Sequence, residues 1–190
     1  MPLIVDKEKI KIEILDAYNR LSDTRPITDI SLREISREAG MSHSKVLRYF
    51  GDKNSLNIAA VHRAGQMLCS QIIDWFGARD IKEFSDMKAY MNAFFHSVSE
   101  SRNMLITPKK IIMTTALASY SKELQNAVKE ELHHIYVTLQ KQLAANYEKK
   151  LSEEEIHIIF FIYFGIYYVG FIDPKMTEID ITKGISQLFL

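Results

Sequence analysis

The sequence predicts an all-α protein, and three observations support this prediction. Apolar residues recur every three or four positions along most of the 190-residue chain, which is the period of an amphipathic helix. Helix-capping residues stand where these periodic stretches begin. The alternation of apolar and polar residues that marks a β-strand does not stand out, nor does an internal repeat or a low-complexity tract.

A first helix is expected over residues 6–21, and a loop over residues 23–30 follows it. Ser31 and Glu34 then form a capping box, in which the side chain of each residue accepts a backbone N–H of the other. A second helix is therefore expected to begin at Leu32. The apolar face of the first helix is formed by Ile10, Ile14, Ala17, Tyr18 and Leu21.

A tight turn and a short helix are expected next. Gly40 can adopt the left-handed conformation that ends the second helix. Ser42 can then cap a helix from about His43 to Phe50, and Asp52 can cap the helix after it.

The short helix over residues 43–50 presents two contrasting faces. Val46 and Phe50 are four residues apart, so they share a direction and are expected to pack on the preceding helix. The opposite face carries a small hydroxyl group, two cations and, at its edge, an aromatic hydroxyl: Ser44, Lys45, Arg48 and Tyr49.

Two short helices joined by a tight turn, the second one basic, can place a helix in the major groove of DNA. Arg and Lys suit guanine edges or phosphates, and Ser suits either. An ordinary solvated helix is the alternative, and it explains Lys45 taken alone equally well. The whole pattern favours DNA binding, through Ser31, Ser42, His43, Ser44, Lys45, Arg48, Tyr49 and Lys53.

Residues 6–56 resemble the helix-turn-helix region of the TetR family of transcriptional regulators. The shared pattern is an Ala-Gly-hydrophobic-Ser run, an aromatic pair that ends a helix, and a Lys and a Leu that follow: Ala39, Gly40, Met41, Ser42, Tyr49, Phe50, Lys53 and Leu56. The rest of the chain resembles the family in length and helical character. The resemblance implies a DNA-binding domain, the head, over residues 1–55. It also implies an effector-binding and dimerisation domain over residues 56–190.

Two residues of the short helix depart from the family pattern. Ser44 stands where the family often has Gly, which lets the start of the helix approach DNA closely. Leu47 stands where the family usually has a Tyr whose hydroxyl meets a phosphate, and Leu47 cannot form that hydrogen bond. Tyr49 and Lys53 match the family's phosphate contacts. We therefore expect an operator that differs from those of other members.

The remaining chain predicts helices over residues 54–76, 81–104, 108–120, 121–147, 156–172 and 177–189. Thr107 is expected to cap the helix that starts at Pro108, because proline is tolerated in the first helical turn. Ser152 and Glu155 form a second capping box.

The segment over residues 156–172 is apolar on all sides, which allows two interpretations. It could span a membrane, but 17 residues is the short limit for a span, and the segment contains His157. It could instead be buried between two copies of the chain, which is how TetR-like proteins dimerise. We favour the dimer, with an interface that includes Leu132, Leu139, Ile156, Phe160, Phe164 and Tyr167.

A ligand pocket is expected in the body, residues 56–190. Met and aromatic side chains lie on its predicted helices, and they are often plain core but could also line a pocket for an apolar ligand. Few Lys or Arg residues lie on the apolar sides of these helices, so a neutral or cationic, partly aromatic effector is expected. The candidate residues are Met67, Trp75, Met91, Phe95, Met113 and Tyr120.

The net charge and the cysteine content constrain how the protein can attract DNA and in which compartment it works. The formal net charge is zero, so any attraction to DNA must be local, as it is where Lys45, Arg48 and Lys53 outnumber Asp52. Cys69 is the single cysteine, so no internal disulfide forms and a reducing compartment is expected. Without a signal peptide at the start, we expect a cytoplasmic protein.

The sequence shows no pattern of a catalytic site. The histidines lack metal-binding spacing, the glycines lack a phosphate-loop partner, and no nucleophile, base and acid share a signature. We expect no enzyme activity, no catalytic residue, no metal and no cofactor.

The resemblance implies a homodimeric repressor that reads two half-sites of a pseudopalindromic, double-stranded operator and releases it when a small molecule binds. One alternative is a DNA binder or activator without an effector. Another is a helical small-molecule-binding protein or enzyme. No membrane partner is expected.

Overall fold

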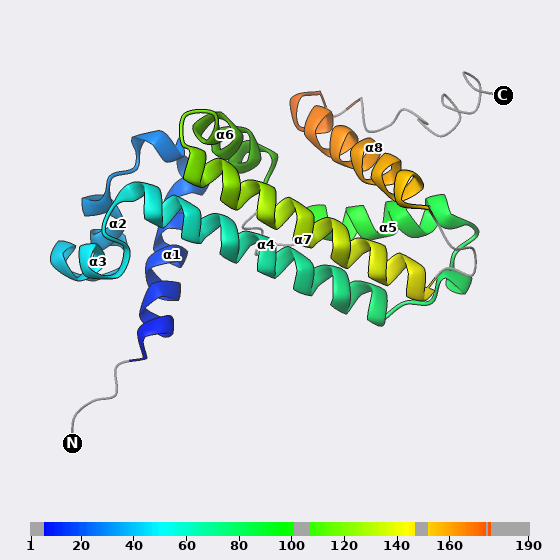
Figure 1. The fold of residues 1–190 in the computed structure, drawn as a ribbon, viewed down its shortest axis with the longest axis horizontal. Helices are drawn as coiled ribbons and strands as arrows, with labels where there is room; N and C mark the ends of the chain where they lie inside the picture. Colours follow the sequence, from blue (N-terminus) through cyan, green and yellow to red (C-terminus); the bar gives the residue numbers. More distant parts are fainter. Residues whose placement is uncertain (1–5, 101–106, 147–151, 174, 176–190) are drawn as a thin grey trace. The chain divides into compact units, whose positions relative to one another are not determined.

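The computed structural model describes residues 6–100, 107–146, 152–173 and 175, and within these residues the chain forms eight α-helices and no β-strand (Figure 1). The predicted all-α fold is confirmed. The expected helix over residues 177–189 lies outside the described residues. The helices are α1 (Lys7–Thr24), α2 (Leu32–Glu38), α3 (His43–Phe50), α4 (Lys53–Gly77), α5 (Met87–Glu100), α6 (Pro108–Ala118), α7 (Lys122–Asn146) and α8 (Glu153–Ile172), with short 3-10 turns η1 (Ile27–Asp29) and η2 (Ile81–Glu83).

The predicted capping residues set the starts of the helices. The Oγ of Ser31 accepts the N–H of Glu34, and the Glu34 carboxylate accepts the N–H of Ser31 at 2.9 Å, so α2 begins at Leu32. Ser152 and Glu155 form the second capping box at the start of α8, with a Ser152 N to Glu155 Oε2 distance of 2.8 Å.

The predicted start of α5 is wrong. The apolar spacing placed it at Ile81, but the chain forms η2 there and is extended at Phe84. Asp86 then accepts the N–H of Ala89 at 2.8 Å, and the helix begins at Met87. Ile81 and Phe84 are three residues apart, which is also the spacing expected on one face of a helix. Both pack against the core of unit 2, but no α-helix joins them. The predicted end near Met104 lies outside the described residues.

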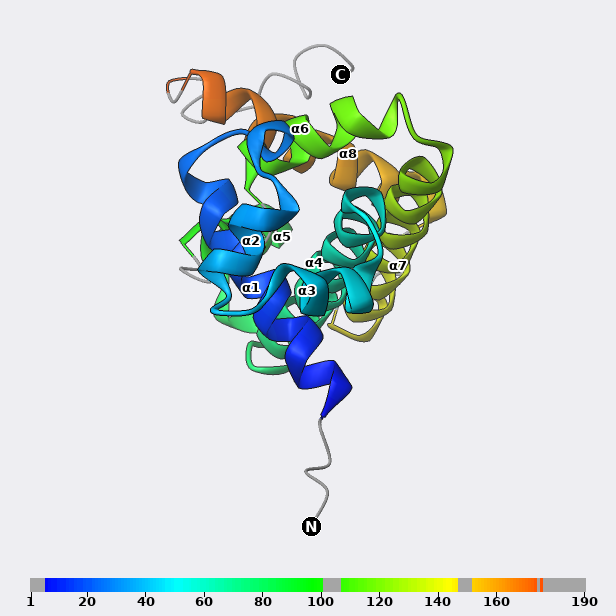
Figure 2. The same cartoon turned by 90° about the vertical axis from the view of Figure 1, so that its left-hand side faces the viewer.

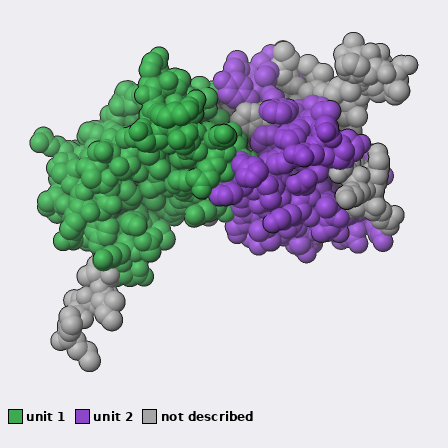
Figure 3. All heavy atoms as spheres, viewed as in Figure 1, with its two compact units in different colours: residues 1–66, 110–132 green, residues 67–109, 133–190 purple. Residues whose placement is uncertain are grey.

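The chain divides into two compact units (Figure 3). Unit 1 comprises residues 1–66 and 110–132, and unit 2 comprises residues 67–109 and 133–190. Unit 1 therefore contains α6 and the first part of α7 in addition to the helices of the head.

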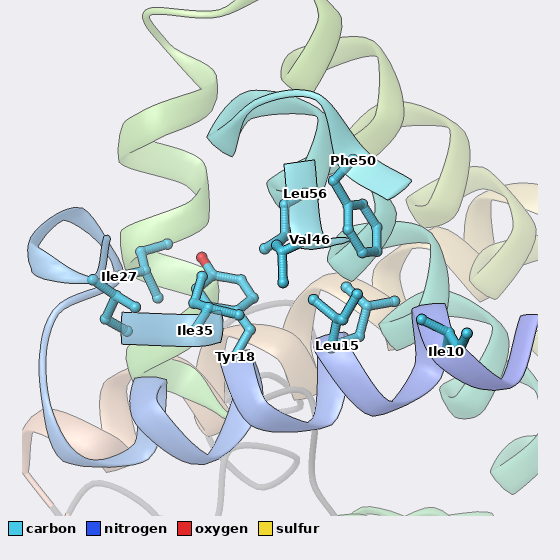
Figure 4. Close-up of a cluster of buried hydrophobic side chains, with 10 residues drawn as sticks. Ile10, Leu15, Tyr18, Ile27, Ile35, Val46, Phe50 and Leu56 are labelled. Carbon is cyan, nitrogen blue, oxygen red and sulfur yellow. The ribbon is translucent and has the colours of Figure 1, made fainter. Parts of the chain in front are cut away.

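The core of unit 1 joins the first four helices (Figure 4). Ile14 of α1, Ile35 of α2, Val46 of α3 and Leu56 of α4 are all 0% exposed. Figure 2 shows α1, α2 and α3 side by side around this core. Met113 and Leu117 pack against the same core, so α6 is part of it.

Ionic contacts also attach α4 and α6 to α1. The buried ammonium of Lys110 in α6 donates a hydrogen bond to Asn19 and pairs with Asp23. Arg63 of α4 pairs with Asp16 at 2.8 Å and donates to the carbonyl oxygen of Ile12 at 3.0 Å. Both cations therefore bind the same helix of the head.

The core of unit 2 is built around aromatic rings. Trp75 lies 5.0 Å from Phe76, 5.0 Å from Tyr90 and 5.3 Å from Phe94, measured between ring centroids. These rings are buried together with apolar residues of the second part of α7: Ile135, Leu139 and Leu143.

Within unit 1, α4 and α7 approach each other closely at Gly65. The Glu131 side chain of α7 is 7% exposed, and its Oε1 lies 2.7 Å from Nδ1 of His62. A Cβ added at Gly65 would lie 2.7 Å from Cδ and 2.8 Å from Cβ of Glu131. Glycine is therefore required here by space, although it weakens a helix interior relative to alanine.

We predict that Gly65→Ala lowers the free energy of unfolding by about 1–3 kcal/mol, because the added methyl group forces Glu131 out of its packed position. Gly77→Ala is the matched control on the same helix, since its added Cβ meets no described atom within 4 Å. Thermal unfolding of both variants measures the difference. A melting temperature of Gly65→Ala equal to that of Gly77→Ala would contradict the close approach.

Candidate nucleic-acid interface

The helix α3 is fixed in place by a glycine at each end and by two buried side chains. Gly40 has φ 63° between α2 and α3, and Gly51 has φ 74° after α3, conformations that favour glycine. Val46 is 0% exposed and Phe50 is 8% exposed, as predicted for the inward face. The side of α3 opposite Val46 and Phe50 therefore faces solvent.

The outward face of α3 is centred on Ser44, Leu47 and Arg48, which are exposed. Their spacing of three and four residues places them on one side of the helix. Lys45, His43 and Tyr49 are half-buried and flank this face. Of the residues predicted to contact DNA, Ser44 and Arg48 thus share the outward face with Leu47, which was not predicted to contact DNA.

Neither cation of α3 pairs with a carboxylate of the described residues. The Arg48 guanidinium lies 5.6 Å from the centroid of the Tyr49 ring. The two carboxylates of α2 have other partners, because Glu34 pairs with Arg25 at 2.9 Å and Glu38 pairs with Arg20 at 2.7 Å. Positive charge on α3 is therefore left for an external anion.

The capping box also keeps Glu34 ionised. The backbone N–H and hydroxyl of Ser31, together with Arg25, lower the pKa of Glu34 from 4.5 to about 2. The folded pKa lies below the usual value, so this contribution to stability is present above pH 4.5 and is lost as pH falls toward 2.

Three of the predicted DNA-binding residues lie at the starts of α2 and α3. The hydroxyls of Ser31 and Ser42 accept backbone N–H groups of their own helices, so both residues have capping roles. His43 is half-buried, and its Nδ1 has no hydrogen-bond partner among the described residues. Contact of these residues with DNA stays a prediction.

Lys53 lies at the start of α4, and its ammonium is held inside the head. Its Nζ donates to the carbonyl oxygen of Ile30 at 2.7 Å and lies 4.2 Å from the centroid of the Tyr18 ring. Burial lowers the pKa of Lys53 from 10.5 to about 8, while the charge of Glu34 opposes this shift and that of Arg25 adds to it. The sequence did not predict these contacts, because Ile30 and Tyr18 belong to other elements.

Two further cations, Arg33 and Arg37, are exposed on α2 and were not among the residues predicted to contact DNA. A helical wheel of α2 could have identified them, since its apolar face through Leu32 and Ile35 leaves both on the other side.

The residues predicted for an effector pocket do not form one cluster. Trp75 and Met91 are buried in the core of unit 2, and Met113 packs against the core of unit 1. Tyr120 was expected inside but is 92% exposed, because α6 ends at Ala118 and the periodic pattern does not continue past it. Met67 is half-buried, and the side chain of Phe95 lies outside the described part.

Three of the residues predicted for a dimer interface face the interior of their own chain. Leu139 and Ile156 are 1% and 2% exposed, and Phe160 packs against the core of unit 2. Leu132 is 40% exposed in unit 1. The side chains of Phe164 and Tyr167 are outside the described part. The periodic pattern of an all-apolar helix did not show which residues pack internally.

The outward side of α8 carries a different set of apolar residues. Ile158 is 57% exposed, Phe161 66%, Val169 41% and Ile172 70%. Together with Gly165 they follow steps of three or four residues along one helix face. In the part of the chain that the structure describes, no helix combines the length and the apolar character needed to cross a membrane.

The chain is similar to known regulators in sequence and in fold. No protein-family model matches it. An uncharacterized HTH-type transcriptional regulator of Haemophilus influenzae is 33% identical over 101 residues. These residues are 53% of this chain and 49% of that protein, so the chain matches about half the length of this curated relative.

Two solved structures share the fold over most of their length. Escherichia coli NemR in its reduced form matches with a TM-score of 0.69 and 13% identity, over 87% of this chain and 89% of NemR. Pseudomonas aeruginosa NalD, described as the secondary repressor of the MexAB-OprM multidrug efflux pump, matches with a TM-score of 0.51 and 16% identity, over 90% and 88%. The chain therefore has the all-α fold of NemR and NalD, as its resemblance to the TetR family implied.

Proposed function

We propose that the protein is a DNA-binding transcriptional regulator and not an enzyme. The observation that carries this proposal is the outward face of α3, where Ser44, Leu47 and Arg48 are exposed on a helix that the core holds rigidly. An exposed cation without an acidic partner among the described residues suits a phosphate or a guanine edge. The similarity to regulators and to a repressor supports the proposal.

We further propose that two copies associate through α8. The face formed by Ile158, Phe161, Val169 and Ile172, here called the α8 face, is exposed and apolar. A contiguous apolar face of this kind marks an interaction site. A second copy of the chain is the occupant we favour, because a pseudopalindromic operator needs two heads related by a two-fold axis.

We also propose that the protein represses transcription and that a small molecule releases it from the operator. NalD, which has the same fold, is described as a repressor. For an apolar effector, we retain Trp75 and Met91 as candidates, because they are the two predicted pocket residues that lie together in one core, that of unit 2. A reducing, cytoplasmic setting agrees with the single free cysteine, Cys69.

We predict that Arg48→Ala weakens binding to the selected operator by about 1–3 kcal/mol, roughly 5- to 150-fold, if the guanidinium contacts a base edge. Gel-shift titrations at fixed salt measure the loss. Lys141→Ala is the control, because Lys141 is an exposed cation on α7 far along the chain from α3. Unchanged affinity and sequence preference in Arg48→Ala would remove this residue from the interface.

We predict that Phe161→Asp converts the dimer into a folded monomer, because a charge buried in an apolar interface lacks a partner. Ile73→Asp is the matched control, since Ile73 is 49% exposed on α4 and lies outside the α8 face. Sedimentation measures the mass, against 22.0 kDa for one chain, and circular dichroism measures the folding. A wild-type monomer, or a dimer that survives Phe161→Asp, would contradict the proposed interface.

We predict that neutral or cationic aromatic compounds exist that raise the melting temperature, change Trp75 fluorescence and release the operator. Stabilisation follows from binding to the folded state alone, and release requires about 1–3 kcal/mol of coupling. A library screen by thermal shift, followed by gel shift, measures both. Compounds that stabilise the protein without changing DNA affinity would favour a regulator without an effector.

A further inference from the structure

Leu47 is an exposed apolar residue in the middle of the outward face of α3. It is 37% exposed, whereas Val46 and Phe50 of the same helix are 0% and 8% exposed. The core of unit 1 does not use Leu47, so packing within the chain does not explain a leucine at this position. A single exposed leucine is ordinary on a protein surface. This one, however, lies on the face proposed to meet DNA.

We propose that Leu47 contacts the 5-methyl group of a thymine in the major groove and thereby selects an A·T pair at one position of each half-site. This inference rests on the proposed function. Leucine has no hydrogen-bond donor or acceptor, so it can read neither a phosphate nor a polar base edge. The thymine methyl is the one apolar group that a base pair presents in the major groove. Contact between the two removes apolar surface from water.

The neighbours of Leu47 place it correctly for this contact. Ser44 precedes it by three residues and Arg48 follows it directly, and all three are exposed. A hydroxyl and a guanidinium on the same side can bind phosphates or base edges on either side of the thymine. The side chain of Leu47 is too short and too apolar to replace a tyrosine hydroxyl at a phosphate, so we place it against a base instead.

The rigidity of α3 makes the contact specific to one position. Ser42 caps the helix through the N–H of Lys45 at 3.3 Å, and Gly51 closes it through a hydrogen bond to the carbonyl oxygen of Leu47 at 2.7 Å. Because Val46 next to it is buried, Leu47 would have to move together with the core of unit 1 to shift along the groove. One isolated apolar side chain among polar residues is also a small target for a protein partner, which requires a larger patch.

The test uses the full-length protein and thymine-to-uracil substitution. An operator is first selected from random double-stranded DNA. Each thymine is then replaced singly by deoxyuridine, which keeps base pairing and removes only the methyl group. For the wild type, one position in each half-site is expected to lose about fourfold in affinity, the effect of burying one methyl-sized group. Leu47→Ala is expected to bind the thymine and uracil operators equally.

Ser44→Ala is the matched control, because it alters the same face without touching the leucine. It is expected to bind more weakly but to keep the difference between thymine and uracil. Circular dichroism checks that both variants remain folded. If Leu47→Ala keeps the full uracil penalty, or if no thymine matters for the wild type, the assignment to Leu47 is overturned while DNA binding stands. If no DNA sequence is selected, the proposed function fails, and this inference fails with it.

Discussion

The burial of Val46 and Phe50 in the core of unit 1 is the constraint on which the candidate interface depends. A helix of eight residues is too short to be stable in water by itself, so tertiary packing must hold it. Each buried side chain of this size contributes about 1.5–3 kcal/mol. The same core contains Ile14, Ile35 and Leu56, so α1, α2 and α4 all contribute to the core into which α3 packs.

The compact unit that carries α3 extends beyond the first four helices. Met113 and Leu117 add α6 to its core, and the buried Lys110 joins α6 to Asn19 of α1. A buried ammonium is costly without a hydrogen-bond partner, so the contact with Asn19 favours keeping α6 against α1. The core that holds α3 therefore includes residues of α6 as well as of the first four helices.

The sequence predicted helix caps and turns well, because these features depend on residues close together in the chain. The capping boxes of Ser31 and Ser152 and the turn at Gly40 are determined by residues three or four positions apart, and all three are confirmed. The start of α5 was wrong because a break in the helix does not interrupt the apolar spacing.

Long-range information was missing for the sites in the body. Periodicity assigns a residue to a helix face, but it does not say what that face meets. For an all-apolar helix such as α8, it could not distinguish Phe160, which packs inward, from Phe161, which is 66% exposed. In the same way the ammonium of Lys53 was expected to be available at the surface, whereas it is bound to the carbonyl of Ile30. Both outcomes depend on which distant segments fold together.

One side of α3 is buried and the other is exposed. The residues that stabilise the fold are therefore different from those proposed to choose the DNA target, and the two sets can evolve independently. Ser44, Leu47 and Arg48 are exposed, and substitutions at such positions usually change stability by less than about 0.5 kcal/mol. Mutations at these positions can therefore accumulate without unfolding the head. A gene duplicate of this regulator could acquire a new set of promoters by changing only these positions, with the same core retained in both descendants.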